Sequence, residues 1–188
     1  MKLILASASP RRRELLEQLG LAFTVCPAAG EPAVSGLPPE ETVRAIALAK
    51  AEEVAARSSS DDLILAADTL VYLDGEPLGK PEGPEDAAAM LRRLSGREHF
   101  VCTGVALIRG SRKLVRSEKT AVRFRILSDD RIRRYVATGE PLDKAGAYGI
   151  QGLGCLLVSG ITGDYSNVVG LPLGLLGGML EEIGAGIL

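Results

Sequence analysis

The feature that most restricts the fold is an almost wholly apolar segment, Leu63–Asp68, with the sequence LILAAD. Such a run predicts a strand buried on both faces, and strands of this kind are typical of sheets covered by helices. Residues 69–73 continue the strand, and Asp74 and Gly75 after it are typical of a tight hairpin turn. The segment therefore predicts an α/β protein whose sheet is flanked by helices.

The rest of the hydrophobic pattern gives further strands and helices. Strands are predicted at residues 2–6, 21–26, 100–109, 114–126 and 156–158. Helices are predicted at residues 11–19, 40–57, 84–94, 128–137 and 173–183, with a proline-rich loop at residues 27–39. The order mixes βαβ units with a hairpin at Gly110 and Ser111, which predicts a mixed, twisted sheet. At this length residues 1–188 are expected to form a single domain.

Composition excludes several classes of function. The hydrophobic fraction is 46% and the formal net charge is -2, so the chain can bury a core and is not disordered. The near-neutral charge argues against a nucleic-acid-binding or membrane-surface protein. No apolar run approaches the ~18 residues of a membrane span, and residues 1–10 lack a signal-peptide pattern. A cytoplasmic protein is expected.

The cysteines and the single histidine are too few and too far apart to indicate a zinc site. Cys26, Cys102 and Cys155 form no CxxC pair and are interpreted as buried structural thiols. His99 lies at the start of the strand predicted at residues 100–109 and alternates with Val101 and Thr103, which favours a structural hydrogen bond. Without a GxSxG motif, one histidine also makes a Ser-His-Asp triad improbable.

The segment Ser7–Arg13, SASPRRR, lies where the first strand ends and the first helix begins. Ser9 is a good N-cap and Pro10 a good first helical residue. A helix N-terminus binds anions, whereas three arginines in its first turn oppose the helix dipole. Acidic residues would stabilise this first turn better than arginines, and a sequence that departs from a local stability preference in this way is typical of a functional site. The segment predicts an anion site, with a solvated basic turn as the alternative.

Three single charges occupy unusual places. Asp68 directly follows the buried apolar run, at the end of the predicted strand. Ligands of open α/β sheets bind at such strand ends, so Asp68 is interpreted as a metal ligand or a general base. The alternative is a residue that only turns the chain. Lys80, between Gly79 and Pro81, either reaches a phosphate or lies on the surface. Lys50, in a helix of small apolar residues, either extends to solvent or is held inward for an anion.

A glycine-rich segment towards the end of the chain, Asp143–Gly152, combines charges, a tyrosine and closely spaced glycines. The amide of Gln151 can donate and accept hydrogen bonds at once, which suits recognition of a nucleobase. A plain turn is the alternative interpretation.

Six separated motifs in this sequence, taken together, resemble the Maf family of nucleoside triphosphate pyrophosphatases. They are LASASPRRRELL (5–16), AADT (66–69), LGKP (78–81), SGREHFVCTGV (95–105), TGEPLDKAGAYGIQG (138–152) and GDYSNVVGLPL (163–173). The resemblance implies two lobes around a cleft, a homodimer, and hydrolysis of a nucleoside triphosphate to the monophosphate and pyrophosphate. It also implies a divalent cation, Mg²⁺ or Mn²⁺, and a role in clearing unwanted nucleotides.

The resemblance also implies roles for single residues. Asp68 corresponds to the proton acceptor of the family. Asp68 and Glu31 both correspond to metal ligands. Arg11, Thr69 and Gln151 correspond to positions linked to base choice. The positions that correspond to phosphate-binding residues are Ser7, Ser9, Arg11, Arg12, Lys50 and Lys80.

The segment AYGIQG resembles the subgroup that acts on dTTP and UTP. One alternative is the same chemistry on a modified purine nucleotide such as 7-methyl-GTP, whose subgroup usually lacks Gln151. The other is a nucleotide-binding regulator of septum formation, which would have no need of a general base at Asp68. Where many members have an Asp before Glu31, this chain has Gly30, which puts a second metal-side carboxylate in doubt.

Overall fold

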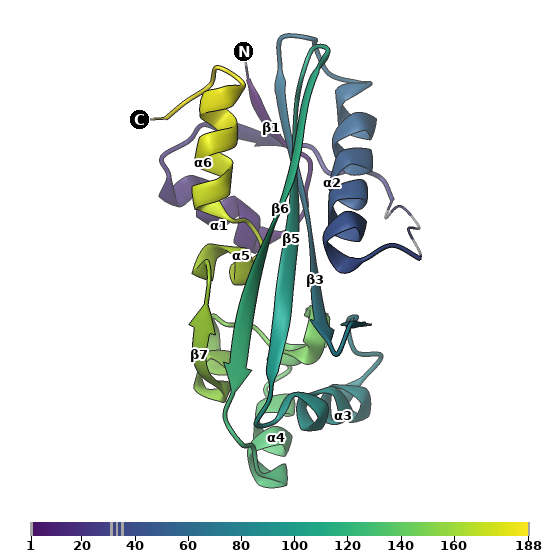
Figure 1. Cartoon of the computed structure of the whole chain (residues 1–188), viewed down its shortest axis with the longest axis vertical. Coiled ribbons are helices and arrows are strands. Elements are labelled where there is room, and N and C mark those ends of the chain that lie inside the picture. The colour runs from purple at the N-terminus through teal and green to yellow at the C-terminus, as the bar shows by residue number, and fades with distance from the viewer. Residues whose placement is uncertain (1, 31, 33, 35, 188) are drawn as a thin grey trace. The chain divides into compact units, whose positions relative to one another are not determined.

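The computed structural model describes residues 2–30, 32, 34 and 36–187, and its framework is a seven-stranded mixed sheet (Figure 1). The strand order is β2-β1-β3-β5-β6-β7, with β4 paired to β3. The strands are β1 (Leu3–Leu5), β2 (Phe23–Val25), β3 (Leu63–Leu73), β4 (Glu76–Leu78), β5 (Glu98–Arg109), β6 (Arg112–Phe124) and β7 (Val158–Thr162). β1 runs parallel to β2 and β3, whereas the β3–β4 and β6–β7 pairs are antiparallel.

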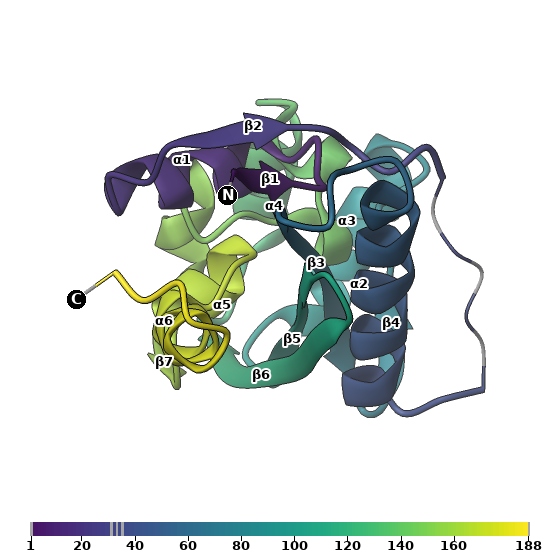
Figure 2. The same cartoon turned by 90° about the horizontal axis from the view of Figure 1, so that it is seen from above.

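The helices are distributed along the whole chain. They are α1 (Pro10–Gln18), α2 (Pro39–Ala55), α3 (Pro84–Leu94), α4 (Asp129–Val136), α5 (Tyr165–Val169) and α6 (Leu173–Glu182). Three 3₁₀ segments lie between α4 and β7, namely η1 (Glu140–Asp143), η2 (Ala145–Ala147) and η3 (Gly152–Leu157). Figure 2 shows β1 and β2 side by side, with α1 connecting them in the chain.

The chain forms two compact units. The first unit comprises Met1–Thr69, Thr103–Glu118 and Gly170–Leu188. The second unit comprises Leu70–Cys102 and Lys119–Val169. The long strands β3, β5 and β6 each contribute residues to both units.

The core of the first unit forms where α2 packs on the sheet (Figure 1). Small and branched side chains meet there, among them Ala47, Ala51, Val54, Ile64, Ala66, Ala106 and Ile108. The backbones of α2 and β5 come close at Gly104, where an added Cβ would lie 2.2 Å from the carbonyl oxygen of Val43. Glycine at position 104 therefore lets the backbones of α2 and β5 touch.

The core of the second unit forms around α3 and α4, which contact each other (Figure 1). Leu91 and Leu94 of α3 and Ile132 and Tyr135 of α4 are buried in it. The Ser128 hydroxyl accepts a hydrogen bond from the Arg131 N–H at 3.2 Å and caps α4 as predicted.

Most predicted elements are confirmed to within a few residues. The buried strand runs from Leu63 to Leu73, the following turn lies at Asp74 and Gly75, and α3 has the predicted bounds. The last predicted strand, at residues 156–158, is confirmed only at Val158. The strand there runs from Val158 to Thr162, and Gly152–Leu157 before it forms η3.

Two smaller predictions have mixed outcomes. Cys102 is buried, as predicted for a structural thiol, but Cys26 is half-buried and Cys155 is exposed, so the prediction is wrong for Cys155. Ser9 occupies the N-cap position of α1, yet its side chain makes no capping hydrogen bond.

Within the part of the chain that the structure describes, none of the helices has the length and apolar character that a membrane span needs.

Candidate active site

A buried ion pair joins the two charges that the sequence places inside the first unit. The Lys50 Nζ of α2 donates to Asp68 Oδ1 of β3 at 2.7 Å, with side-chain exposures of 14% and 8%. The apolar residues of β3 and the small residues of α2 bring this pair together. Ions this well shielded from water are stabilised only by close partners, so each fixes the position of the other.

The guanidinium of Arg12 holds three parts of the first unit together. Its Nη1 donates to Ser7 Oγ at 2.9 Å, its Nη2 to Thr69 Oγ1 at 3.1 Å, and its Nε to the carbonyl of Gly170 at 2.8 Å. A planar guanidinium with fixed donors suits such a junction. Arg12 therefore links the end of β1, the middle of β3 and the segment that leads into α6.

Thr69 has a second partner that the sequence did not single out. Its Oγ1 lies 2.9 Å from the Oγ1 of Thr103 on β5, and Thr103 is fully buried. Because successive residues of a strand point to opposite faces, Asp68 points towards α2 and Thr69 towards Arg12 of α1. Thr103 lies in the motif SGREHFVCTGV, which is the only sequence signal that could have drawn attention to it.

The remaining predicted residues of the first unit lie at the start of α1. Ser7 is buried, and its Oγ also accepts from the N–H of Ser9 at 3.3 Å. Arg11 is half-buried, and α1 has no acidic residue in its first turn. This turn therefore keeps the cationic character that the sequence predicts for an anion site.

Lys80 and Gln151 belong to the second unit, and both are exposed. Their segments are connected, because the N–H of Gly146 donates to the carbonyl of Gly79 at 3.0 Å. The loop of Lys80 and the segment that leads to Gln151 are thus held side by side within this unit.

The predicted metal ligand Glu31 lies outside the described residues. Among the residues that are described, no group of three His, Cys, Asp or Glu side chains is close enough to hold a metal ion. Asp68 offers one carboxylate, and Mg²⁺ is commonly bound by one or two carboxylates together with substrate phosphates. The donor set fits a cation that a triphosphate brings with it.

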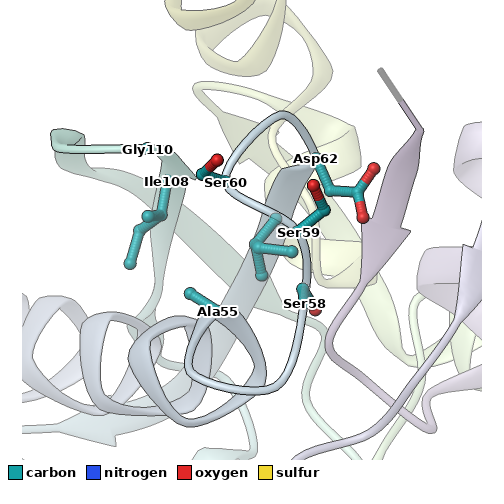
Figure 3. A pocket seen from close by; sticks show the side chains of 8 residues that line it. Ala55, Ser58, Ser59, Ser60, Asp62, Ile108 and Gly110 are labelled. Carbon is teal, nitrogen blue, oxygen red and sulfur yellow. The ribbon is translucent and has the colours of Figure 1, made fainter.

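A hollow of about 200 Å³ in the first unit lies apart from these residues (Figure 3). It is lined at its polar side by Ser58, Ser59, Ser60 and Asp62 and at its apolar side by residues such as Ile108. The carboxylate of Asp62 and the lack of any lysine or arginine in this lining make the hollow unsuited to a triphosphate.

Comparison with known proteins identifies the family. Residues 2–183 match the sequence model described as "Maf-like protein". The chain belongs to the Maf family. Three relatives are each named dTTP/UTP pyrophosphatase. The protein from Moorella thermoacetica is 61% identical (92% of this chain, 90% of the relative), that from Symbiobacterium thermophilum 54% (97% and 94%), and that from Gloeobacter violaceus 52% (97% and 96%).

A solved structure supports the fold of this Maf-family chain. This chain resembles the structure of the Ham1 protein of Staphylococcus aureus, with a TM-score of 0.50 and 14% sequence identity. The match covers 82% of this chain and 78% of the Ham1 chain. The prediction of a mixed α/β sheet flanked by helices is confirmed.

Proposed function

We propose that this Maf-family chain hydrolyses dTTP and UTP to the nucleoside monophosphate and pyrophosphate. The observation that carries the proposal is the buried pair of Lys50 and Asp68, which holds a carboxylate in a fixed place at the end of an apolar run. A binding protein has no need of such a carboxylate, whereas a hydrolase that activates water does. The names of the relatives give the substrate class.

In the proposed reaction, the carboxylate of Asp68 accepts a proton from the water that attacks the α-phosphorus. A bond forms between the water oxygen and the α-phosphorus. The bond from the α-phosphorus to the oxygen shared with the β-phosphorus breaks, and that oxygen leaves with pyrophosphate. Lys50 fixes the carboxylate through the 2.7 Å contact, so the base does not have to be oriented at the moment of reaction.

Cationic and hydroxyl side chains are proposed to bind the triphosphate. Phosphoryl transfer depends mainly on positioning and on neutralising the charge of the phosphates. We assign this role to the groups that the family pattern indicates, which are Ser7, Ser9, Arg11, Arg12, Lys50 and Lys80. Because Arg12 donates to Ser7, Thr69 and Gly170, it also orders the residues around it.

A divalent cation, Mg²⁺ or Mn²⁺, is proposed to bind with the substrate through Asp68 and Glu31. When bound, it would withdraw charge from the phosphate oxygens and so make the phosphorus a better electrophile. The test is removal of divalent cations with a chelator, which should abolish pyrophosphate release, and addition of Mg²⁺ or Mn²⁺ should restore it.

Base choice is proposed to depend on Gln151, with Arg11 and Thr69. Uracil and thymine present a ring N–H next to a carbonyl, and an amide offers the matching acceptor and donor. Gln151 is exposed, so its amide can meet a base that arrives from solvent.

The deciding assay incubates the protein with Mg²⁺ and, separately, dTTP, UTP, CTP, ITP or 7-methyl-GTP, and measures monophosphate and pyrophosphate. We expect dTTP and UTP to give the highest kcat/KM. Orthophosphate as the first product would contradict the pyrophosphatase assignment. Activity confined to 7-methyl-GTP would contradict the pyrimidine assignment and support the modified-purine alternative.

We also propose a homodimer that acts in the cytoplasm. Sedimentation equilibrium of the purified protein tests the first point, because a dimer has twice the mass of the 19.8 kDa chain. Fractionation of cells tests the second.

A further inference from the structure

The loop that carries Gln151 is closed at its base by contacts between its two ends. Gly149 lies before Gln151 in the chain, and Gly154 lies after it. Gly149 is half-buried and Gly154 is buried, whereas Gln151 is exposed. A Cβ added to Gly154 would lie 2.0 Å from the carbonyl oxygen of Gly149 and 2.7 Å from the hydroxyl of Tyr135. The two ends of the loop therefore touch through their backbones, with Gln151 outside.

One carboxylate, that of Glu140, holds the outgoing end of this loop. Its Oε2 accepts from the N–H of Leu153 at 3.0 Å, and its Oε1 accepts from the N–H of Gly154 at 2.9 Å. Hydrogen bonds from N–H groups to an ionised carboxylate are about twice as strong as those between neutral groups. Both oxygens of Glu140 are thus committed to the backbone of one loop.

The hydroxyl of Tyr135, on α4, joins this carboxylate to the incoming end of the loop. It donates to Glu140 Oε1 at 2.9 Å and accepts from the N–H of Gly149 at 3.2 Å. Tyr135 is itself buried in the core of the second unit. Gln151 is therefore connected through two side chains to a helix that is fixed by the packing of the core.

The titration behaviour of both groups agrees with these contacts. Burial raises the pKa of Tyr135, and the neighbouring Glu140 adds to this, so the phenol stays protonated and can donate. Burial alone would raise the pKa of Glu140. The N–H groups of Gly154 and Leu153 and the hydroxyl of Tyr135 more than offset it and lower that pKa.

We infer that Glu140 and Tyr135 are positioning residues for base selection: they hold the loop Gly149–Gly154 so that the amide of Gln151 meets the nucleobase in one orientation. The inference rests on the proposed function, because it assigns Gln151 to the base. In cytosine, the ring nitrogen and the amino group exchange the donor and acceptor that uracil presents, so only one orientation of the amide matches each base. A fixed loop backbone limits the positions from which the Gln151 side chain can reach the base and so favours one of these orientations.

The main test compares Glu140→Gln with the wild type. Glutamine has the size of glutamate but only one acceptor oxygen, so one of the two loop N–H groups would face an NH₂ group. Tyr135→Phe is the second variant and removes only the bridging hydroxyl. Matched controls in the same unit are Glu76→Gln, in an exposed ion pair with Arg93, and Tyr165→Phe, on an exposed tyrosine.

Two measurements are made on each variant. The first is kcat and KM for dTTP, UTP and CTP. The second is hydrogen–deuterium exchange of the peptide that covers residues 145–157, without any ligand. For Glu140→Gln we expect KM for dTTP and UTP to rise about ten-fold and their preference over CTP to fall by a similar factor, with little change in kcat. Loop exchange should become faster in Glu140→Gln, less so in Tyr135→Phe, and in neither control.

Each outcome supports or overturns the inference. An equal loss of kcat/KM for dTTP, UTP and CTP would indicate a purely structural role and overturn it. So would unchanged loop exchange in both variants. If Glu140→Gln does not fold, Tyr135→Phe decides. If the wild type releases no pyrophosphate from dTTP or UTP, the proposed function fails, and with it the base-selection part of the inference. The exchange data then decide whether Glu140 and Tyr135 hold the loop.

Discussion

The two units place their candidate site residues on different kinds of structure. In the first unit, Asp68 is buried on a central strand, and its partner Lys50 is half-buried on a long helix. In the second unit, Gln151 is exposed on a glycine-rich loop held by Glu140 and Tyr135. Groups on packed elements keep their geometry whatever the substrate, whereas a loop held by one carboxylate can be adjusted by small changes.

This difference predicts two classes of variant. Changes to the ion pair of the first unit, Asp68 and Lys50, should lower the turnover of every substrate to a similar extent. Changes to the loop of the second unit should mainly alter which nucleotide is preferred.

The largest effect is expected for Asp68→Asn, which keeps the shape of the side chain but removes the proton acceptor. Turnover of dTTP, UTP and CTP should each fall by about 10³-fold, the range of general base catalysis. Asp61→Asn, on an exposed acid of the same unit, should leave turnover unchanged. Steady-state pyrophosphate release measures both. Full activity of Asp68→Asn, or a loss confined to one nucleotide, would break the proposed division between the units.

The second prediction concerns the stability that the buried pair brings to the first unit. Lys50→Met leaves the carboxylate of Asp68 buried without its ammonium, so the free energy of unfolding should fall by about 3 kcal/mol. Adding Asp68→Asn to Lys50→Met should recover part of this loss, because the buried negative charge is then gone. Urea unfolding curves measure these changes.

The matched control for the pair is Lys113→Met. Lys113 Nζ and Glu52 Oε1 lie 2.6 Å apart, close to the 2.7 Å of the buried pair, but the exposed fractions of these side chains are 49% and 46%. A loss below about 1 kcal/mol is expected for such a surface pair. Equal losses in the two lysine variants would show that burial of the Lys50–Asp68 pair is energetically unimportant.

A third prediction concerns acid sensitivity of the second unit, and it rests on His99. Its Nε2 lies 2.7 Å from the hydroxyl of Tyr148, which confirms the predicted structural hydrogen bond, and the residue is 0% exposed. Burial lowers the pKa of His99 from 6.5 to about 4. Within the part of the chain that the structure describes, its Nδ1 has no partner, so a second N–H would be buried without an acceptor.

Because the folded pKa of His99 is depressed, the unfolded chain binds the extra proton first as pH falls. Stability is therefore full above pH 6.5 and is lost as pH falls towards 4, by about 3 kcal/mol in total. His99→Gln keeps a polar group towards Tyr148 but does not titrate, so its free energy of unfolding should change less over this range. Urea unfolding at several pH values measures the difference. An identical pH dependence in the two proteins would contradict the assignment to His99.

The smallest effect is expected for Thr103→Val, which removes a buried hydroxyl without changing the size of the side chain. Losing its 2.9 Å contact with Thr69 should cost about 1 kcal/mol of unfolding free energy and lower turnover a few-fold. Thr24→Val, on an exposed position of β2, should change neither. A change in nucleotide preference without a change in turnover would instead assign Thr103 to base choice, together with Thr69.

Sequence patterns predicted the elements whose signals are local. The apolar run Leu63–Asp68 predicted the central strand, and the acidic first turn and basic last turn of α3 predicted its bounds. The apolar residues Leu156–Val158 equally suggested a strand. Contacts of Gly154 with Gly149 and Glu140 favour a 3₁₀ segment there instead, and such contacts cannot be deduced from a hydropathy pattern.

The same limit applies to the candidate site. Asp68 and Lys50 each stood out as a charge in apolar surroundings, but their pairing across 18 residues depends on how α2 packs on β3. Glu140 gave no signal beyond its place in a motif, because the loop N–H groups that it accepts from are 13 and 14 residues away. Thr103 could not be singled out as a site residue from the sequence, because its role depends on contact with Thr69 of β3.

Gly104 has a consequence for engineering this chain. The obstacle that a side chain would meet there is the backbone of α2, and no repacking of neighbouring side chains can remove it. A library that randomises the apolar residues of the first unit would therefore return many solutions at the surrounding positions but only glycine at position 104. This one position sets how near the helix that carries Lys50 can come to the sheet that carries Asp68.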